Sequence, residues 1–128
     1  MEMCNCVSTS NYKSDALVAQ KKLEEVSPTF CLAKWNQVSL HLPTGLTNSC
    51  YHPPLHNIDP TKLVDNPAAL HNTAEKMKQR ELMIKGERPD GCSYCWKMED
   101  TGETSDRHYR SGEPWAMQDF EQIRQNPM

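Results

Sequence analysis

The feature of this sequence that most limits its folding is a shortage of aliphatic side chains. Only 20 of the 128 residues are Leu, Ile, Val or Phe. A fraction this low is typical of disordered chains, but disorder also requires a large net charge. Here the net charge is only −3. We therefore expect a single small domain whose thin core needs additional cross-links, and six cysteines are available to supply them.

The composition excludes several classes of protein. No run of 18 apolar residues is present, so no membrane span is expected. The net charge and the lack of a basic block argue against a nucleic-acid partner. The first ten residues are polar and hold two cysteines, which is unlike a secretory signal, so we expect a cytoplasmic protein. Thiols stay reduced there, which favours metal binding or redox chemistry and leaves a disulfide framework as an alternative.

Local periodicity predicts a small α+β fold. Apolar and polar residues alternate from Asn36 to Cys50 on both sides of Pro43-Thr44-Gly45, as in a β-hairpin. From Pro67 to Lys85, apolar residues recur at helical spacing between Asn66 and Gly86, which are typical helix-start and helix-stop residues. The expected fold is a metal-clipped α+β domain with one hairpin, one long helix and irregular loops. Further helices are predicted over 15–25 (with Leu17, Val18 and Leu23 as apolar residues), 95–99 and 115–125, and a loop over 101–114.

Four cysteines carry the main functional signal. Cys92 and Cys95 form a C-x-x-C pair on a turn preceded by glycine, and this spacing lets two thiolates bind one metal centre. Cys31 precedes the predicted hairpin and Cys50 ends it, so a hairpin that turns at Gly45 brings these two cysteines together. We expect all four to be ligands of one metal site.

The identity of the metal is open on chemical grounds. Four thiolates suit either zinc or an iron–sulfur cluster, and their spacing does not separate the two. A zinc site would be a closed structural site, in a domain that works through its surface. This chemistry alone slightly favours zinc.

The spacing of the cysteines resembles that of a known family. Thirteen residues separate Cys31 from Gly45, and four more separate Gly45 from Cys50. This pattern is similar to the C-x(9–15)-G-x(4)-C signature of the SPASM and twitch regions of radical SAM proteins. The stretch from Met83 to Cys95 and its continuation to Arg107 also resemble that region.

The resemblance covers roughly residues 30–110 and implies an auxiliary [4Fe–4S] cluster bound by Cys31, Cys50, Cys92 and Cys95. In that family such clusters transfer electrons or hold a substrate, which is often a peptide or protein. The implied organisation is a polar N-terminal arm (1–29), the iron–sulfur domain (30–110), and a tail or the start of a further domain (111–128). A radical SAM barrel, in the same chain or in another, is the implied partner.

The sequence also departs from the family. The SAM-binding cluster requires C-x(3)-C-x(2)-C, and no such run occurs; Cys4 and Cys6 have the wrong spacing, and we expect them to have no role. Thr101 stands where the longer SPASM pattern would continue with cysteine, which leaves four ligands and one cluster. We therefore expect a truncated product, a fragment or a stand-alone accessory domain. It would not be catalytic alone, and SAM would be a cofactor only with a downstream core.

Several other side chains are expected to lie near the cysteines and to support the metal site. His52 and His56 are expected to be solvated or to make hydrogen bonds around the site, with a ligand role as the alternative. Glu99 and Arg107 are expected to form an ion pair, and Trp35 or Trp96 could shield a cluster from water. Cations near the anionic cluster are expected from the sequence neighbours Lys34, Arg88 and Lys97.

Overall fold

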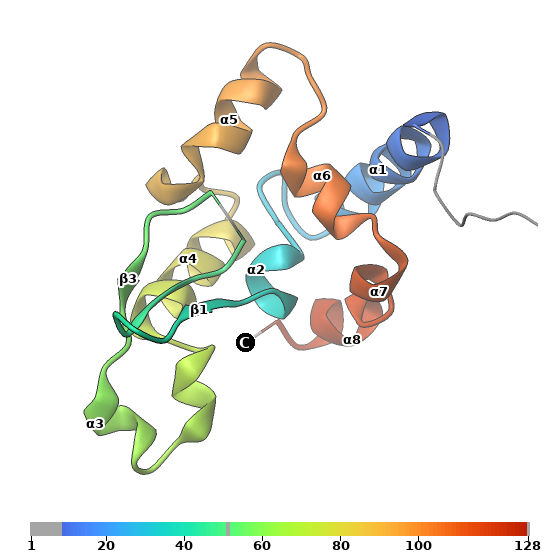
Figure 1. Ribbon diagram of the computed structural model, residues 1–128. Coiled ribbons are helices and arrows are strands. Elements are labelled where there is room, and N and C mark those ends of the chain that lie inside the picture. The colour runs from blue at the N-terminus through green and yellow to red at the C-terminus, as the bar shows by residue number, and fades with distance from the viewer. Residues whose placement is uncertain (1–8, 51, 128) are drawn as a thin grey trace, which may run out of the picture.

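The computed structural model describes residues 9–50 and 52–127, so Cys4 and Cys6 lie outside the described residues (Figure 1). No helix in this part of the chain is both long and apolar enough to span a bilayer. In chain order the elements are α1 (Thr9–Glu24), α2 (Ala33–Asn36), β1 (Ser39–His41), β2 (Leu46–Asn48), β3 (His56–Asn57), α3 (Pro60–Leu63), η1 (Pro67–Leu70), α4 (Ala74–Ile84), η2 (Asp90–Cys92), α5 (Ser93–Asp100), α6 (Asp106–Ser111), α7 (Pro114–Met117) and α8 (Phe120–Gln125).

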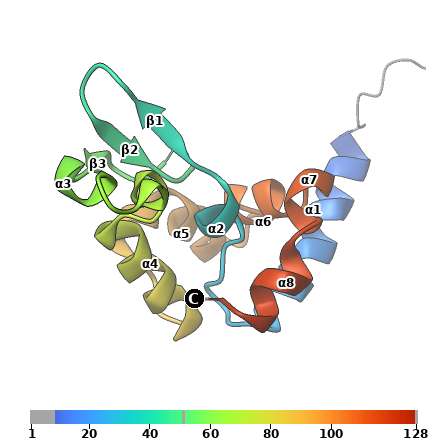
Figure 2. The same ribbon diagram turned by 90° about the horizontal axis from the view of Figure 1, so that it is seen from below.

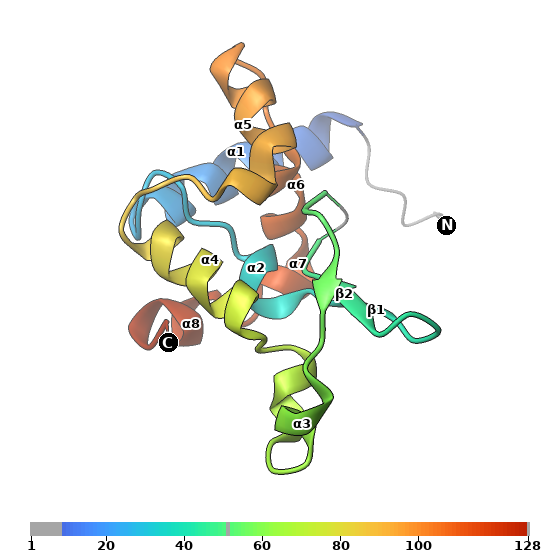
Figure 3. The same ribbon diagram turned by 90° about the vertical axis from the view of Figure 1, so that its left-hand side faces the viewer.

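The elements form two groups that meet at the short helix α2. Figures 1 and 2 show α1, α6, α7 and α8 on one side and the small sheet with α3 and α4 on the other. The β1–β2 hairpin and α3 extend away from the rest of the domain (Figure 3). This arrangement confirms a small α+β domain.

The predicted hairpin is confirmed, although its strands are short. β1 pairs antiparallel with β2, with Leu40 opposite Thr47. Gly45 in the turn has a φ of 70°, a conformation that glycine adopts without steric cost. The sequence did not predict β3, which pairs antiparallel with β2 through Leu46 and Asn57 to complete a three-stranded sheet.

The core consists of two small clusters. The first surrounds the cysteines and contains Met83 and Trp96. The second contains residues from each of the three predicted segments, 1–29, 30–110 and 111–128. In it, Leu23 packs with Phe30, Leu32, Ala116 and Phe120. The N-terminal and C-terminal segments are therefore packed against the central segment in one body.

The first helix buries different residues from those predicted. α1 begins at Thr9 rather than near residue 15, and its buried face is made of Ala16, Ala19 and Leu23. Leu17 and Val18 are 45% and 54% exposed. Small alanines allow α1 to lie close to α6, with which it makes extensive contact.

The predicted long helix from Pro67 to Lys85 is wrong in its first part. The chain forms η1, turns, and then begins α4 at Ala74. Thr73 explains the break, because its side-chain oxygen accepts a hydrogen bond from the Lys76 N–H at 3.2 Å and so starts a new helix.

The predicted loop over 101–114 is also wrong, because it contains α6. Ser105 and His108 form a reciprocal cap at the start of this helix, and Asp106 lies in its first turn. The predicted C-terminal helix over 115–125 is divided into α7 and α8.

Candidate metal centre

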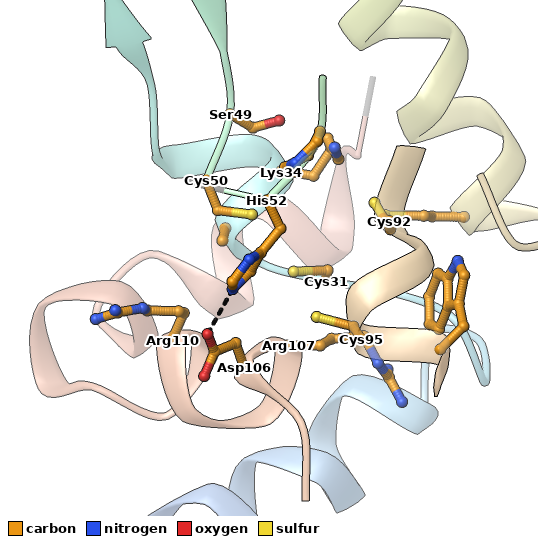
Figure 4. Close-up of a pocket in the computed structure, with 14 residues that line it drawn as sticks. Cys31, Lys34, Ser49, Cys50, His52, Cys92, Cys95, Asp106, Arg107 and Arg110 are labelled. Atoms are coloured by element: carbon orange, nitrogen blue, oxygen red, sulfur yellow. Dashed lines mark hydrogen bonds and ion pairs between the residues drawn. The ribbon is translucent and has the colours of Figure 1, made fainter. Parts of the chain in front are cut away.

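Four cysteines from different parts of the fold line one cavity. Cys31 precedes α2, Cys50 follows β2, Cys92 ends η2 and Cys95 lies in the first turn of α5. Figure 4 shows their sulfurs directed toward the space between these elements. All four are free thiols in the structure. The fold thus brings together the four residues that the sequence singled out.

Long-range hydrogen bonds fix the segment that carries Cys31. The Arg107 guanidinium donates to the Phe30 carbonyl at 2.7 Å, and the Leu32 N–H donates to Ser111 Oγ at 3.1 Å. Both partners belong to α6, on the side of Cys31 away from the hairpin. The position of Cys31 therefore depends on the helix that sequence reasoning missed.

The C-x-x-C pair is held by a turn and a tryptophan. The Cys92 N–H donates to the Pro89 carbonyl at 3.1 Å, and Trp96 Nε1 donates to the same oxygen at 2.9 Å. Trp96 is 7% exposed and lines the cavity, as expected of a residue that shields a metal site. Trp35 instead packs on Phe30, with ring centroids 4.5 Å apart.

Burial disfavours the thiolate form of Cys31, Cys92 and Cys95 in the metal-free site. Loss of solvation and repulsion from the other three sulfurs raise the pKa of Cys31 to about 12. Burial likewise raises the pKa of Cys95 to about 11, and it raises that of Cys92. The site therefore disfavours free thiolates, and only a bound cation can compensate four of them together.

Positive charge lies near the sulfurs. Burial raises the pKa of Cys92, and the charges of Lys34 and Arg107 oppose that rise. Both side chains line the cavity. Positive charge near sulfur stabilises its anionic, metal-bound form and tunes the potential of a cluster.

Other polar groups around the cavity are available to a bound group. Lys34, Arg107 and Arg110 line it. Ser49 lines it too, and its buried hydroxyl has no hydrogen-bond partner within the described part of the chain. An unpartnered buried hydroxyl is costly unless something absent from the protein chain accepts its hydrogen bond.

The histidines near the cysteines have other partners. His52 lines the cavity, but its Nε2 lies 2.6 Å from Asp106 Oδ2 (Figure 4). The His52 ring also stacks on Tyr94. His56 Nε2 contacts Thr73 Oγ1 at 2.7 Å. Each histidine therefore makes a hydrogen bond through Nε2, as the expected supporting role requires.

The expected cations are partly wrong. Lys34 lines the cavity, but Arg88 is bound to Asp100 on the surface, and Lys97 is exposed. The sequence did not predict the two arginines at the cavity, Arg107 and Arg110, and it gave Arg107 a role only as the partner of Glu99. That ion pair is confirmed, with Arg107 Nε 2.9 Å from Glu99 Oε2.

The four thiols as they stand do not form a single-ion site. Within residues 9–50 and 52–127, no group of three or more His, Cys, Asp or Glu side chains is arranged to hold a metal ion. As a donor set, four thiolates suit either zinc or an iron–sulfur cluster.

Comparisons with protein families, with characterised proteins and with solved structures found no match to this chain. Only the chain's own residues and the resemblance in cysteine spacing therefore bear on its function.

The raised thiol pKa values give a testable prediction. In the folded, metal-free chain at pH 8, Cys31 should hold about a thousandfold less thiolate than an ordinary cysteine, because three pKa units separate about 12 from 9. Iodoacetamide labelling followed by peptide mass spectrometry should show Cys31 reacting far more slowly than in the same chain unfolded in urea. Equal rates in the two states would contradict the buried, neutral thiol.

Proposed function

We propose that this chain holds one [4Fe–4S] cluster on Cys31, Cys50, Cys92 and Cys95. It would be the twitch-like part of a radical SAM protein, used in electron transfer or in positioning a substrate. The single observation that carries the proposal is that four thiols from three separate segments line one cavity. A bound [4Fe–4S] cluster supplies one-electron chemistry or an open coordination position, and the protein supplies its placement.

The chain's own residues would divide the work of holding such a group. Trp96 and Met83 exclude water from one side of the cavity, while Lys34 and Arg107 add positive charge to its lining. Cys50 is the most exposed of the four cysteines. We therefore place the side for electron exchange or substrate approach at Cys50, beside His52, Asp106 and Arg110.

The partners follow from the resemblance as proposals. A radical SAM barrel, in the same chain or in another, would supply the SAM chemistry, and a peptide or protein is the expected class of substrate. A cytoplasmic location would suit the assembly of a cluster on reduced thiols.

Anaerobic reconstitution tests the proposed function. The full chain is treated with ferrous iron and sulfide under reducing conditions, desalted, and analysed for iron, sulfide and absorption near 400 nm. We expect about four iron atoms per chain and a broad band near that wavelength. Stoichiometric zinc uptake in a parallel sample, with no retained iron and no colour, would replace the proposal with a structural zinc site.

We also predict that the chain does not cleave SAM alone. No C-x(3)-C-x(2)-C run is present in the sequence to bind a SAM cluster. The reconstituted chain, incubated with SAM and dithionite, should form no 5′-deoxyadenosine above a no-protein control when products are quantified by chromatography. Formation of this product would overturn the auxiliary role and would reopen the roles assigned to Cys4 and Cys6.

A further inference from the structure

Three cationic side chains are buried where α2 and α4 pack together, and one of them, Lys34, lines the cysteine cavity. Lys34 is 2% exposed, Lys76 is 0% exposed and Arg80 is 6% exposed. Long cationic side chains are rarely buried to this extent unless an anion compensates them. The three residues lie on α2 and α4, which pack against each other. They form one group, which we call the buried cations.

The buried cations bond only neutral groups. Lys34 Nζ donates to Gln79 Oε1 at 2.7 Å, and Lys76 Nζ donates to Thr47 Oγ1 at 3.0 Å. Arg80 Nε donates to the Lys34 carbonyl at 3.0 Å.

No carboxylate compensates this group. Among the described residues, none forms an ion pair with any of the three buried cations. Glu75 comes nearest through the hydrogen-bond network, but its carboxylate reaches only Gln79 Nε2, at 3.2 Å. The metal-free chain therefore keeps positive charge in its interior without a counter-ion.

The cations also repel one another. Burial, Arg80 and Lys34 together lower the pKa of Lys76 to about 8. Its ammonium is completely covered, so a diffusible anion cannot reach it in the folded chain. The counter-ion must be one that sits inside the fold next to the group.

The cysteine cavity is where such an anion would lie. Lys34 lines the cavity, and its positive charge acts on Cys92. A [4Fe–4S] core on four thiolates carries a net negative charge of about two, or about three when reduced. We propose that Lys34, Lys76 and Arg80 are the internal counter-charge of the bound cluster, an inference that rests on the proposed function. The positive charge of these three side chains would strengthen binding of the cluster and would stabilise its reduced state.

This role makes opposite predictions for the two forms of the protein. In the metal-free chain, removing one of three mutually repelling charges should stabilise the fold. In the loaded chain, the same change removes compensation from an anion and should weaken cluster binding. A residue that only fills space or makes a hydrogen bond would change both forms in the same direction.

The test uses Lys76→Met, which keeps an unbranched side chain and removes the charge. Thr47 Oγ1 would lose a donor but would still donate to the Ser39 carbonyl at 2.7 Å. The matched control is Lys78→Met, because Lys78 is an exposed lysine on the same helix. Three readings are taken on the full chain: the urea midpoint of the metal-free form, the rate of iron loss to a chelator, and the reduction potential by dye-mediated titration.

We expect Lys76→Met to raise the urea midpoint of the metal-free chain and to weaken cluster retention about 10- to 100-fold. The reduction potential should become more negative, and Lys78→Met should match the wild type in all three readings. A metal-free variant that unfolds at lower urea, or a potential equal to that of the wild type, would overturn the inference while leaving the cluster in place. A wild-type chain that takes up no cluster would refute the proposed function, and this inference with it.

Discussion

Replacing Cys95 by alanine should abolish cluster binding, with iron falling from about four atoms per chain to near zero after reconstitution. Cys95 is 6% exposed, and it lines the cavity with the other three cysteines. Its loss removes one of four ligands and leaves no other cysteine of the described residues to replace it, because the remaining three already line the same cavity. Iron and sulfide analysis with absorption near 400 nm measures the effect.

The same substitution should also loosen the fold. Metal-binding free energy contributes directly to folding when the site exists only in the folded state. The wild-type chain should therefore gain urea resistance on reconstitution, and Cys95→Ala should gain none. Cys4→Ala is the control and should behave as wild type in both assays. Equal losses from substitutions at all six cysteines would point instead to a disulfide framework.

The sequence predicted the candidate site better than the helices around it. Cysteines are rare and chemically specific, so their spacing around Gly45 and in the Cys92–Cys95 pair indicated which residues would meet. The positions of α1 and α6 depend on small residues and on buried polar contacts, such as Ala16 and Ser111, which give weak periodic signals. The reciprocal cap of Ser105 and His108 was a local signal that could have revealed α6.

Two of the three buried cations could not be anticipated from the sequence. Lys34 was expected near the cysteines because it is a sequence neighbour of Cys31, but Lys76 and Arg80 are ordinary surface residue types. Only the packing of α4 on α2 buries them. The charge around the proposed cluster therefore depends on tertiary structure, whereas its proposed ligands were inferred from sequence spacing.

Glu99→Gln should destabilise the metal-free chain by about 3 kcal/mol or more, the scale for removing one partner of a buried ion pair. Arg107 has a side chain that is 2% exposed, and its Nε and Nη2 both contact Glu99, each at 2.9 Å. The amide would leave the buried guanidinium with only Glu24 as a counter-charge, and Glu24 Oε2 lies 3.8 Å from Nη2 on a side chain that is 42% exposed. Because Arg107 also holds the Phe30 carbonyl, Cys31 should lose its fixed position as well.

The pH dependence of this effect has a defined sign. Burial opposes ionisation of Glu99, but hydrogen bonds from Arg107 and Ser105 outweigh it and lower the pKa of Glu99. The stabilisation is therefore complete above the ordinary glutamate pKa of about 4.5 and is lost as the pH falls through the lowered pKa of the folded state. The wild type and Glu99→Gln should differ most near neutral pH, and their free energies of unfolding should converge in acid.

Urea denaturation of the reduced, metal-free chain at a series of pH values measures this difference. Asp100→Asn is the matched control, because Asp100 pairs with the exposed Arg88 at 2.8 Å on the surface of the same helix. Solvent screens that pair, so its loss should leave the urea midpoint nearly unchanged. A Glu99→Gln midpoint as high as that of Asp100→Asn at pH 7 would show that the Arg107 guanidinium finds compensation elsewhere, and the role of this ion pair in fixing Cys31 would then be wrong.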